Sequence, residues 1–374
     1  MAQPMTENIL AQLEHDEFRL SRNDIGGLPL PLGEGWGEGL RSLISAEALT
    51  RFASQIDLSP PGRGEPTSPQ VESIKSHTAL AHVRTSVLDI ACEQSGPAGS
   101  LPVVLLHGYP YDARAFGEVV PIVNSAGFRT IVPYLRGYGA TSFLSPDTPR
   151  SGEQAALGQD LLELLDALQI RQAVLAGFDW GGRAACVVSA LWPERVRGLV
   201  TCTGYQIQDI ANSDRPADPE QERRFWYQYY FHTERGRNGL TQRRSELGRS
   251  LWKLWSPTWA FDDATYGRTA ASFENADFVD VVIHSYRHRM GNAAGDPRYA
   301  PIEARLATLP RINVPTIVIH GAVDGVNPAE NSEAHQKYFT GHYQRRVFED
   351  VGHNPPQEAP RAFAEAVLDL CKHP

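Results

Sequence analysis

Short apolar runs alternate with longer helical patterns from His77 to the C-terminus. The runs are rich in Val, Ile and Leu and have the length of strands rather than of helices. This alternation predicts an α/β fold, in which helices flank a mostly parallel eight-stranded sheet. The candidate strands are 80–84, 87–92, 103–107, 130–133, 173–176, 198–202, 316–320 and 343–348, and the candidate helices lie near 113–126, 152–168, 182–192, 330–339 and 360–370.

The strand candidates stop at Cys202 and resume at Thr316. The segment 205–300 between them is rich in aromatic residues and arginine and has no strong strand pattern, so a helical cap domain is expected there. A layer inserted at this point would lie over the carboxyl ends of the strands, where open α/β sheets bind ligands. The predicted core is therefore in two parts, 77–204 and 301–374.

The first 76 residues differ from the rest of the chain. Between Gly26 and Gly39, eight of fourteen positions are Gly or Pro. A stretch of this kind carries no apolar period and cannot build a core element. Residues 1–76 are predicted to be a largely disordered extension, with an interaction or targeting arm as the alternative.

Composition excludes several classes of protein. The 374 residues hold 35 Lys and Arg against 44 Asp and Glu, a net charge of −9, which disfavours a nucleic-acid partner. No apolar stretch approaches the ~18 residues of a membrane span, and no secretory signal is evident at the N-terminus. A cytoplasmic location is expected, because the cysteines are few and scattered: Cys92, Cys186, Cys202 and Cys371.

The segment from Leu175 to Gly182 reads as a strand, a tight turn and a helix. Glycines at 177 and 181 permit a sharp turn that lifts the central side chain above the sheet edge, the layout of a nucleophile elbow. The central residue is Asp179, where serine is more usual. The alternative is an aspartate that only caps the following helix.

With this elbow the sequence resembles the α/β-hydrolase superfamily over about 77–374. It resembles in particular the branch with an aspartate nucleophile, which includes epoxide hydrolases and haloalkane dehalogenases. Three further segments match in order: His107-Gly108-Tyr109-Pro110 after the third strand, Asp324 after the strand that ends at His320, and Gly352-His353-Asn354 after the last strand. The order nucleophile, acid, histidine is the order of this fold.

The chemistry explains an aspartate at the elbow. A carboxylate that attacks an sp³ carbon bearing a leaving group forms an ordinary alkyl ester, so the substrate should be an electrophile such as an epoxide or a haloalkane. Water activated by His353, which Asp324 orients, would cleave the ester, while the N–H groups of Tyr109 and Trp180 stabilise the oxyanion. Asp324 as a mere turn former beside Gly325 stays open, as does a loop histidine without a task.

The leaving group separates epoxide hydrolases from dehalogenases, because an alkoxide must be protonated and a halide need not be. The resemblance implies two cap tyrosines as proton donors, here Tyr227 and Tyr286. Tyr229 could replace Tyr227, and all three could simply be packing residues of the cap. Opening of epoxides to vicinal diols is favoured over dehalogenation. Predicted substrate contacts are His107, Pro110, Trp180 and Tyr229.

Other kinds of site are weakly indicated. His284 and His288 have the i, i+4 spacing of metal ligands, but no third ligand accompanies them, so no metal is expected. No phosphate-binding loop follows a strand, so no cofactor is expected. The cap arginines at 235, 237, 243, 244 and 249 read as a solvated helix face, with attraction of an anionic substrate as the alternative. A ligand-binding protein without turnover is the rival from another class, and the oligomeric state is open.

Overall fold

The computed structural model of the chain describes residues 79–372. The extension expected over 1–76 lies outside these residues. Within the described range, no helix combines the length and the apolar character needed to cross a membrane.

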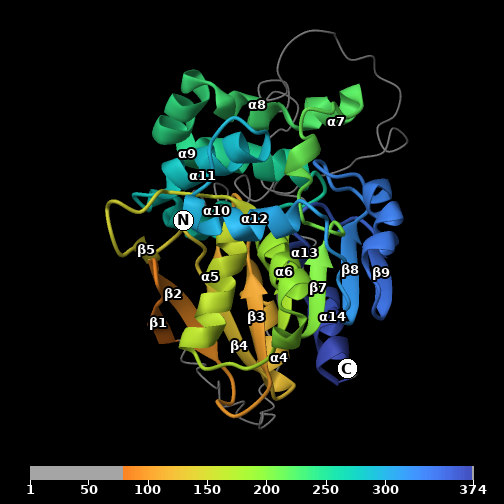
Figure 1. Cartoon of the computed structure of the whole chain (residues 1–374). Coiled ribbons are helices and arrows are strands. Elements are labelled where there is room, and N and C mark those ends of the chain that lie inside the picture. The colour runs from red at the N-terminus through yellow and green to blue at the C-terminus, as the bar shows by residue number, and fades with distance from the viewer. Residues whose placement is uncertain (1–78, 373–374) are drawn as a thin grey trace, which may run out of the picture. The chain divides into compact units, whose positions relative to one another are not determined.

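The described residues form one mostly parallel sheet, drawn as arrows in Figure 1. Its strands are β1 (Ala79–Arg84), β2 (Leu88–Ser95), β3 (Pro102–Leu106), β4 (Arg129–Pro133), β5 (Ser142–Phe143), β6 (Ala173–Gly177), β7 (Val196–Cys202), β8 (Thr316–Gly321) and β9 (Tyr343–Phe348). Along the sheet their order is β1-β2-β4-β3-β6-β7-β8-β9. Strand β2 is antiparallel to its neighbours, and the pairs from β4 to β9 are parallel.

The central strands β6 and β8 are buried at every position, as expected for parallel strands covered on both faces. The predicted α/β fold class is therefore confirmed. Among the described residues, the two-residue strand β5, which pairs with β2, is the one that the sequence pattern did not indicate.

Helices cover both faces of the sheet. Those of the core are η1 (Ala113–Phe116), α4 (Val119–Ser125), α5 (Gln154–Ala167), α6 (Asp179–Leu191), η2 (Pro193–Arg195), α12 (Ala300–Leu306), η6 (Ala329–Tyr338), α13 (Pro355–Glu358) and α14 (Pro360–Lys372). In the view of Figure 1, α5 and α6 lie in front of the sheet, and α14 packs with α4 against the other face.

Three predicted helices differ in detail from the structure. The helix expected over 113–126 is divided into η1 and α4, because the N–H of Gly117 bonds back to Arg114 and ends the first turn. The helix expected over 330–339 is a 3₁₀ helix. The helix expected from Gly182 begins at Asp179, so the central residue of the elbow is also the first residue of α6.

The chain between β7 and α12 is helical and lies above the carboxyl ends of the strands in Figure 1. Its elements are η3 (Ile210–Asn212), α7 (Pro219–Arg224), α8 (Trp226–His232), α9 (Glu234–Trp255), α10 (Asp263–Ala270), η4 (Ala271–Glu274), α11 (Phe278–Arg289) and η5 (Pro297–Tyr299). The side chains of Asp218, Thr233 and Asp262 cap α7, α9 and α10 by accepting bonds from N–H groups of the first turns. We call the elements η3 to η5 the cap.

Candidate active site

Asp179 lies at the turn between β6 and α6, with a backbone φ of +49°. This left-handed conformation is strained for a residue with a side chain, and it is typical of a nucleophile elbow. The turn leaves no room for a side chain at Gly177, where a Cβ would lie 2.6 Å from the carbonyl carbon of Gly181. The local sequence therefore forces the carboxylate of Asp179 to the carboxyl edge of the sheet.

The loop after β3 holds one oxygen of this carboxylate. The backbone N–H of Tyr109 donates a 2.7 Å hydrogen bond to Oδ1 of Asp179. The approach requires glycine at 108, since a Cβ there would lie 2.3 Å from the Cβ of Asp179. Among the described residues, no hydrogen bond from the N–H of Trp180 reaches the carboxylate.

His353 and Asp324 complete a line of charged groups with Asp179. Nδ1 of His353 donates a 2.8 Å bond to Oδ2 of Asp324, and Nε2 of His353 lies 3.7 Å from Oδ2 of Asp179. The other oxygen of Asp324 accepts bonds from the N–H groups of Val326 and Asn327, at 2.8 and 2.9 Å. Asp324 thus fixes the ring of His353, and Nε2 faces the carboxylate of Asp179.

The charges in this line shift the pKa values of its members. Burial favours neutral His353, but the carboxylates of Asp324 and Asp179 outweigh it and raise the pKa of His353 to about 10. Burial would raise the pKa of Asp179, yet His353, the charge of Arg183 and the bond from Tyr109 hold that pKa below its ordinary value. Asp179 and His353 therefore form an ion pair at neutral pH.

The last residue of α9 joins the cap to both catalytic loops. The backbone carbonyl of Trp255 accepts bonds from the N–H groups of Gly325, at 2.9 Å, and of His353, at 3.1 Å. The ring of Trp255 also packs edge-on against the ring of His353, with 5.1 Å between centroids. The acid and the histidine are thus held by a cap residue as well as by the sheet.

Two cap tyrosines lie against each other near Asp179. The rings of Tyr227 on α8 and Tyr286 on α11 are edge to face, with centroids 5.3 Å apart, and both are buried. Burial raises the pKa of Tyr227 to about 12 and the pKa of Tyr286 well above its ordinary value, and the Asp179 carboxylate adds to both shifts. Both phenols keep their protons at neutral pH and can act as donors.

A cavity of about 310 Å³ opens beside Asp179 and Tyr227, and Tyr286 is not among the residues that line it. Asp179, His353 and Tyr227 line it, together with Gln228 and two arginines, Arg183 and Arg289. The sequence pattern did not indicate either arginine as a site residue. The signal for Arg183 is its position, one helical turn after Asp179 on α6, which places both side chains on the same side of the helix.

Four expected substrate contacts lie elsewhere, and none of them lines this cavity. His107 is buried under the loop, where Nε2 accepts a 3.0 Å bond from the N–H of Leu135, and burial lowers its pKa to about 4. The carbonyl of Pro110 accepts a bond from Trp252. Trp180 is buried among aromatic rings, and Tyr229 is exposed and bonds Glu222.

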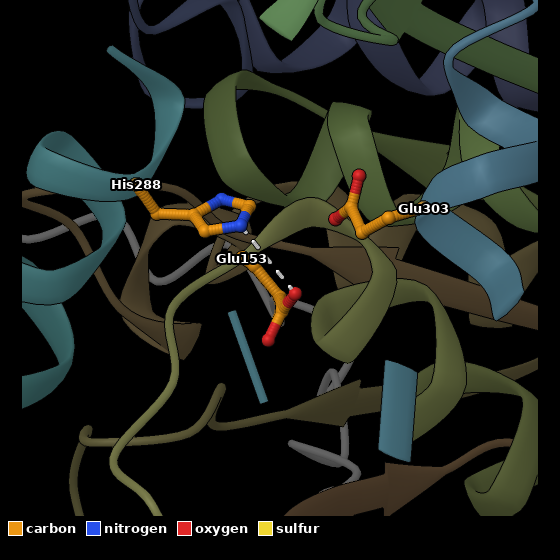
Figure 2. A group of neighbouring side chains, drawn as sticks. All are labelled: Glu153, His288 and Glu303. Atoms are coloured by element: carbon orange, nitrogen blue, oxygen red, sulfur yellow. Dashed lines mark ion pairs between the residues drawn. The ribbon is translucent and has the colours of Figure 1, made fainter. Parts of the chain in front are cut away.

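A second cluster of ionisable side chains joins the loop before α5 to the cap. Glu153, His288 and Glu303 place one ligand-type atom each within 4.8 Å of one another, as Figure 2 shows. Both carboxylates already accept hydrogen bonds from the protein: Glu153 from Ser151 and the N–H of Asp296, and Glu303 from Gln154 and the N–H of Ala155. These hydrogen bonds explain the cluster as a structural contact between the cap and the segment before α5.

The histidine pair of the sequence analysis meets this cluster only through His288. The ring of His284 accepts a 3.0 Å bond from the N–H of Gly152 at Nδ1 and bonds the carbonyl of Ala294 at Nε2. Both ring nitrogens are thereby occupied, so His284 is no metal ligand in this arrangement.

The comparisons with known proteins agree with this geometry. The sequence model of the family described as alpha/beta hydrolase fold matches residues 102–360. The chain belongs to the α/β-hydrolase family. The crystal structure of a candidate epoxide hydrolase from Klebsiella pneumoniae is similar with a TM-score of 0.77 and 46% identity, over 78% of this chain and 97% of that one.

Curated relatives point the same way. Epoxide hydrolase A of Mycobacterium tuberculosis is 23% identical over 77% of this chain and 95% of its own length. Epoxide hydrolase 2 of Siraitia grosvenorii is 37% identical over 113 residues, which cover 30% of this chain and only about a third, 34%, of that relative. The chain is thus similar to epoxide hydrolases, as its sequence motifs predicted.

Proposed function

We propose that this hydrolase opens epoxides to vicinal diols through a covalent ester on Asp179. The observation that carries the proposal is the arrangement of Asp179, which accepts a bond from Tyr109 and faces a histidine that Asp324 holds. The segment 205–300 would act as the cap domain that closes over a small substrate. Water is the second reactant, and no step needs a cofactor.

In the first step, an oxygen of Asp179 attacks an oxirane carbon. The ring C–O bond breaks, and the leaving oxygen takes the phenolic proton of Tyr227 or Tyr286. An alkoxide is far more basic than a phenolate, so the transfer is downhill once the bond has broken. The products of this step are a hydroxyalkyl ester and a tyrosinate.

Esterification removes the negative charge of Asp179, which is one of the groups that raise the pKa of His353. The pKa of His353 falls, and its proton passes to the tyrosinate through the cavity. Neutral His353 then takes a proton from water, and the hydroxide attacks the carbonyl carbon of the ester. The N–H of Tyr109, with that of Trp180, stabilises the tetrahedral oxyanion.

Collapse of this intermediate breaks the bond between the carbonyl carbon and the alkyl oxygen. The diol leaves with the proton of His353, and the new carboxylic acid of Asp179 returns its proton to His353. Enzyme and protons are restored, and the sum is one epoxide plus one water to one diol.

Dehalogenation of a haloalkane by the same triad is the second candidate. One observation favours it: the indole N–H of Trp180, next to Asp179 in the sequence, is buried and has no hydrogen-bond partner among the described residues. Trp180 does not line the cavity, so a halide would have to leave toward its ring. Incubation with matched epoxides and chloroalkanes, with diol and halide measured separately, distinguishes the two reactions.

A single turnover in ¹⁸O-labelled water tests the ester. With enzyme in excess over an epoxide, the diol should carry the unlabelled oxygen of Asp179, and the label should appear in the Asp179 peptide. Many turnovers should then label the diol, which serves as the control. Label in the diol of the first turnover would show direct attack by water and overturn the proposal.

A further inference from the structure

Arg183 is a buried cation without a partner. Its exposed fraction is 5%, and its Nε and one terminal nitrogen have no hydrogen-bond partner among the described residues. It lines the cavity that Asp179 and His353 also line. A buried charge without a partner is costly, so such a group calls for a partner that an ordered water, an ion or a ligand can supply.

A second arginine reaches the same cavity from the cap. Arg289, the last residue of α11, is half-buried, and its Nε and one terminal nitrogen also lack partners among the residues that the structure describes. Its guanidinium lies 4.3 Å from the ring centroid of Tyr286. Burial and the charge of Arg289 lower the pKa of Arg183 to about 10, which leaves Arg183 charged at neutral pH.

Other arginines of the chain have the carboxylate partners that Arg183 and Arg289 lack among the described residues. Arg136 is as deeply buried as Arg183, but its guanidinium donates two 2.6 Å bonds to the carboxylate of Asp160 and one of 2.7 Å to a backbone carbonyl. On the surface of the cap, Arg237 pairs with Asp280. No such carboxylate approaches Arg183 or Arg289 within ion-pair distance among residues 79–372.

The charges on the cavity lining do not cancel. Of the residues that line it, Asp179 is the one buried carboxylate, whereas His353, Arg183 and Arg289 can carry positive charge. Asp324 and Glu303, which partly balance His353 and Arg183, lie outside the lining. Asp209 also contributes to the lining, but it is exposed at the rim, where its carboxylate bonds Asn212. The lining itself is therefore more positive than negative, which favours an anionic ligand.

We infer that the substrate is a small epoxide that carries a carboxylate, bound by Arg183 and Arg289 while an oxirane carbon meets Asp179. The inference rests on the proposed function for the reaction at the oxirane, but the binding of an anion by the two arginines does not depend on that function. Guanidinium groups match planar carboxylates with paired N–H donors. A volume of about 310 Å³ suits a short acid.

A different role for Arg183 must be separated from this one. Its charge also lowers the pKa of Asp179, so its loss could slow every substrate alike. The discriminating quantity is the ratio of kcat/KM for an acid to kcat/KM for its neutral amide. A role confined to Asp179 lowers both values and leaves the ratio unchanged, whereas recognition of the carboxylate changes the ratio.

The experiment compares oxirane-2-carboxylate with oxirane-2-carboxamide, and both with 1,2-epoxybutane, in the full-length protein. We expect the acid to be preferred. Arg183→Gln and Arg289→Gln should each lower the acid-to-amide ratio roughly 10- to 100-fold, as loss of a hydrogen bond to a charged group does. Arg183→Lys should restore part of the ratio. Arg237→Gln, which removes an exposed arginine of the cap, is the matched control and should keep the ratio.

Further arms separate the inference from the proposed function. If the amide and epoxybutane are hydrolysed as well as the acid, with equal ratios in all variants, the anion site is refuted and the function stands. If no epoxide reacts but chloroacetate releases chloride in an Arg183- and Arg289-dependent way, the function is refuted and the anion site stands. A preference for oxiran-2-ylphosphonate over the carboxylate would overturn the choice of anion. If Arg183→Gln fails to fold, the acid-to-amide ratio of Arg289→Gln, at the end of α11, tests the anion site instead.

Discussion

Asp179, Asp324 and His353 lie on loops at the carboxyl ends of strands, where backbone N–H groups of Tyr109 and Val326 bond the two carboxylates. The cap half of the site has no such bonds. Tyr227 and Tyr286 lie on helices and contact chiefly other aromatic rings. Backbone donors fix an atom to within a hydrogen bond, whereas aromatic packing fixes a ring and leaves its polar tip available to a ligand.

The difference suggests a division of labour. The sheet half would carry the covalent chemistry, for which small displacements are costly, and the cap half would carry proton donation and recognition of the substrate. Substitutions in the sheet half should then remove a step entirely, and those in the cap half should slow a step or change its substrate preference.

The largest effect is expected for Asp179→Asn. An amide is no nucleophile, so ester formation should fall by ~10⁴-fold or more, although the N–H of Tyr109 can still bond the side-chain oxygen. Rapid quenching and mass analysis of the Asp179 peptide measure the ester. Asp179→Ala excludes recovery of activity through deamidation of the Asn variant. Undiminished turnover by the Ala variant would remove Asp179 from the mechanism.

His353→Gln should separate the two steps. The variant loses the largest of the interactions that lower the pKa of Asp179, but the charge of Arg183 and the bond from Tyr109 remain, so Asp179 should still alkylate. The water loses its base, so ester hydrolysis should fall by ~10²- to 10⁴-fold. The ester should accumulate as a mass increase on the Asp179 peptide. A folded variant that binds substrate and shows no adduct would contradict the assignment of roles.

The two steps should also differ in their dependence on pH. Asp179 has a pKa below its ordinary value, and Tyr227 has one of about 12, so ester formation should be flat between about pH 5 and 9. Ester hydrolysis needs neutral His353, whose pKa in the ester lies below the value of about 10 in the free enzyme. Below that lower pKa, hydrolysis should fall about tenfold per pH unit, and ester should build up.

Single-turnover quenching across this range reports both steps separately. Ester formation that declines at low pH together with hydrolysis would contradict the separate protonation requirements of the two steps.

A moderate effect is expected for the cap tyrosines. Single Tyr227→Phe and Tyr286→Phe changes should slow ester formation modestly, because the remaining phenol still donates, and the double change should nearly abolish it. The rings that pack in the cap are retained in all three variants. A double variant that forms ester at the wild-type rate would exclude both tyrosines as proton donors.

The smallest effect is expected for Tyr229→Phe. This side chain is exposed on α8 and bonds Glu222, away from the cavity, so activity should change less than about twofold. The variant is the matched control for Tyr227→Phe, two residues earlier on the same helix. A large loss of activity would return Tyr229 to the site.

The sheet half could be predicted from the sequence because its geometry is local. A strand, a Gly-x-Asp-x-Gly turn and a helix place Asp179 whatever surrounds them, and Asp324 and His353 each follow a strand that ends at the same edge. The motif that contains His107 did not predict the role of this residue correctly. His107 belongs to the matching segment, yet its ring bonds the backbone of Leu135 and positions the loop rather than the substrate.

The cap half depends on packing between helices, which periodicity does not specify. Tyr227 and Tyr229 are the same residue type within one aromatic run, so the sequence does not distinguish their environments. The contacts of α8 with α9 and α11 determine which of the two is buried. The cap arginines that the sequence analysis read as a solvated helix face do lie on the surface, but residue content gave no sign of the arginines that line the cavity. The dense run on α9 is ion-paired on the surface, whereas the cavity takes Arg183 from the elbow helix and Arg289 from the end of α11.

The bonds at Trp255 have a mechanical consequence. Its carbonyl bonds Gly325, beside the acid, and His353 itself, so the C-terminal end of α9 cannot lift without loosening both catalytic loops. A movement of the cap that leaves Asp324 and His353 in place must therefore also leave this end of α9 in place.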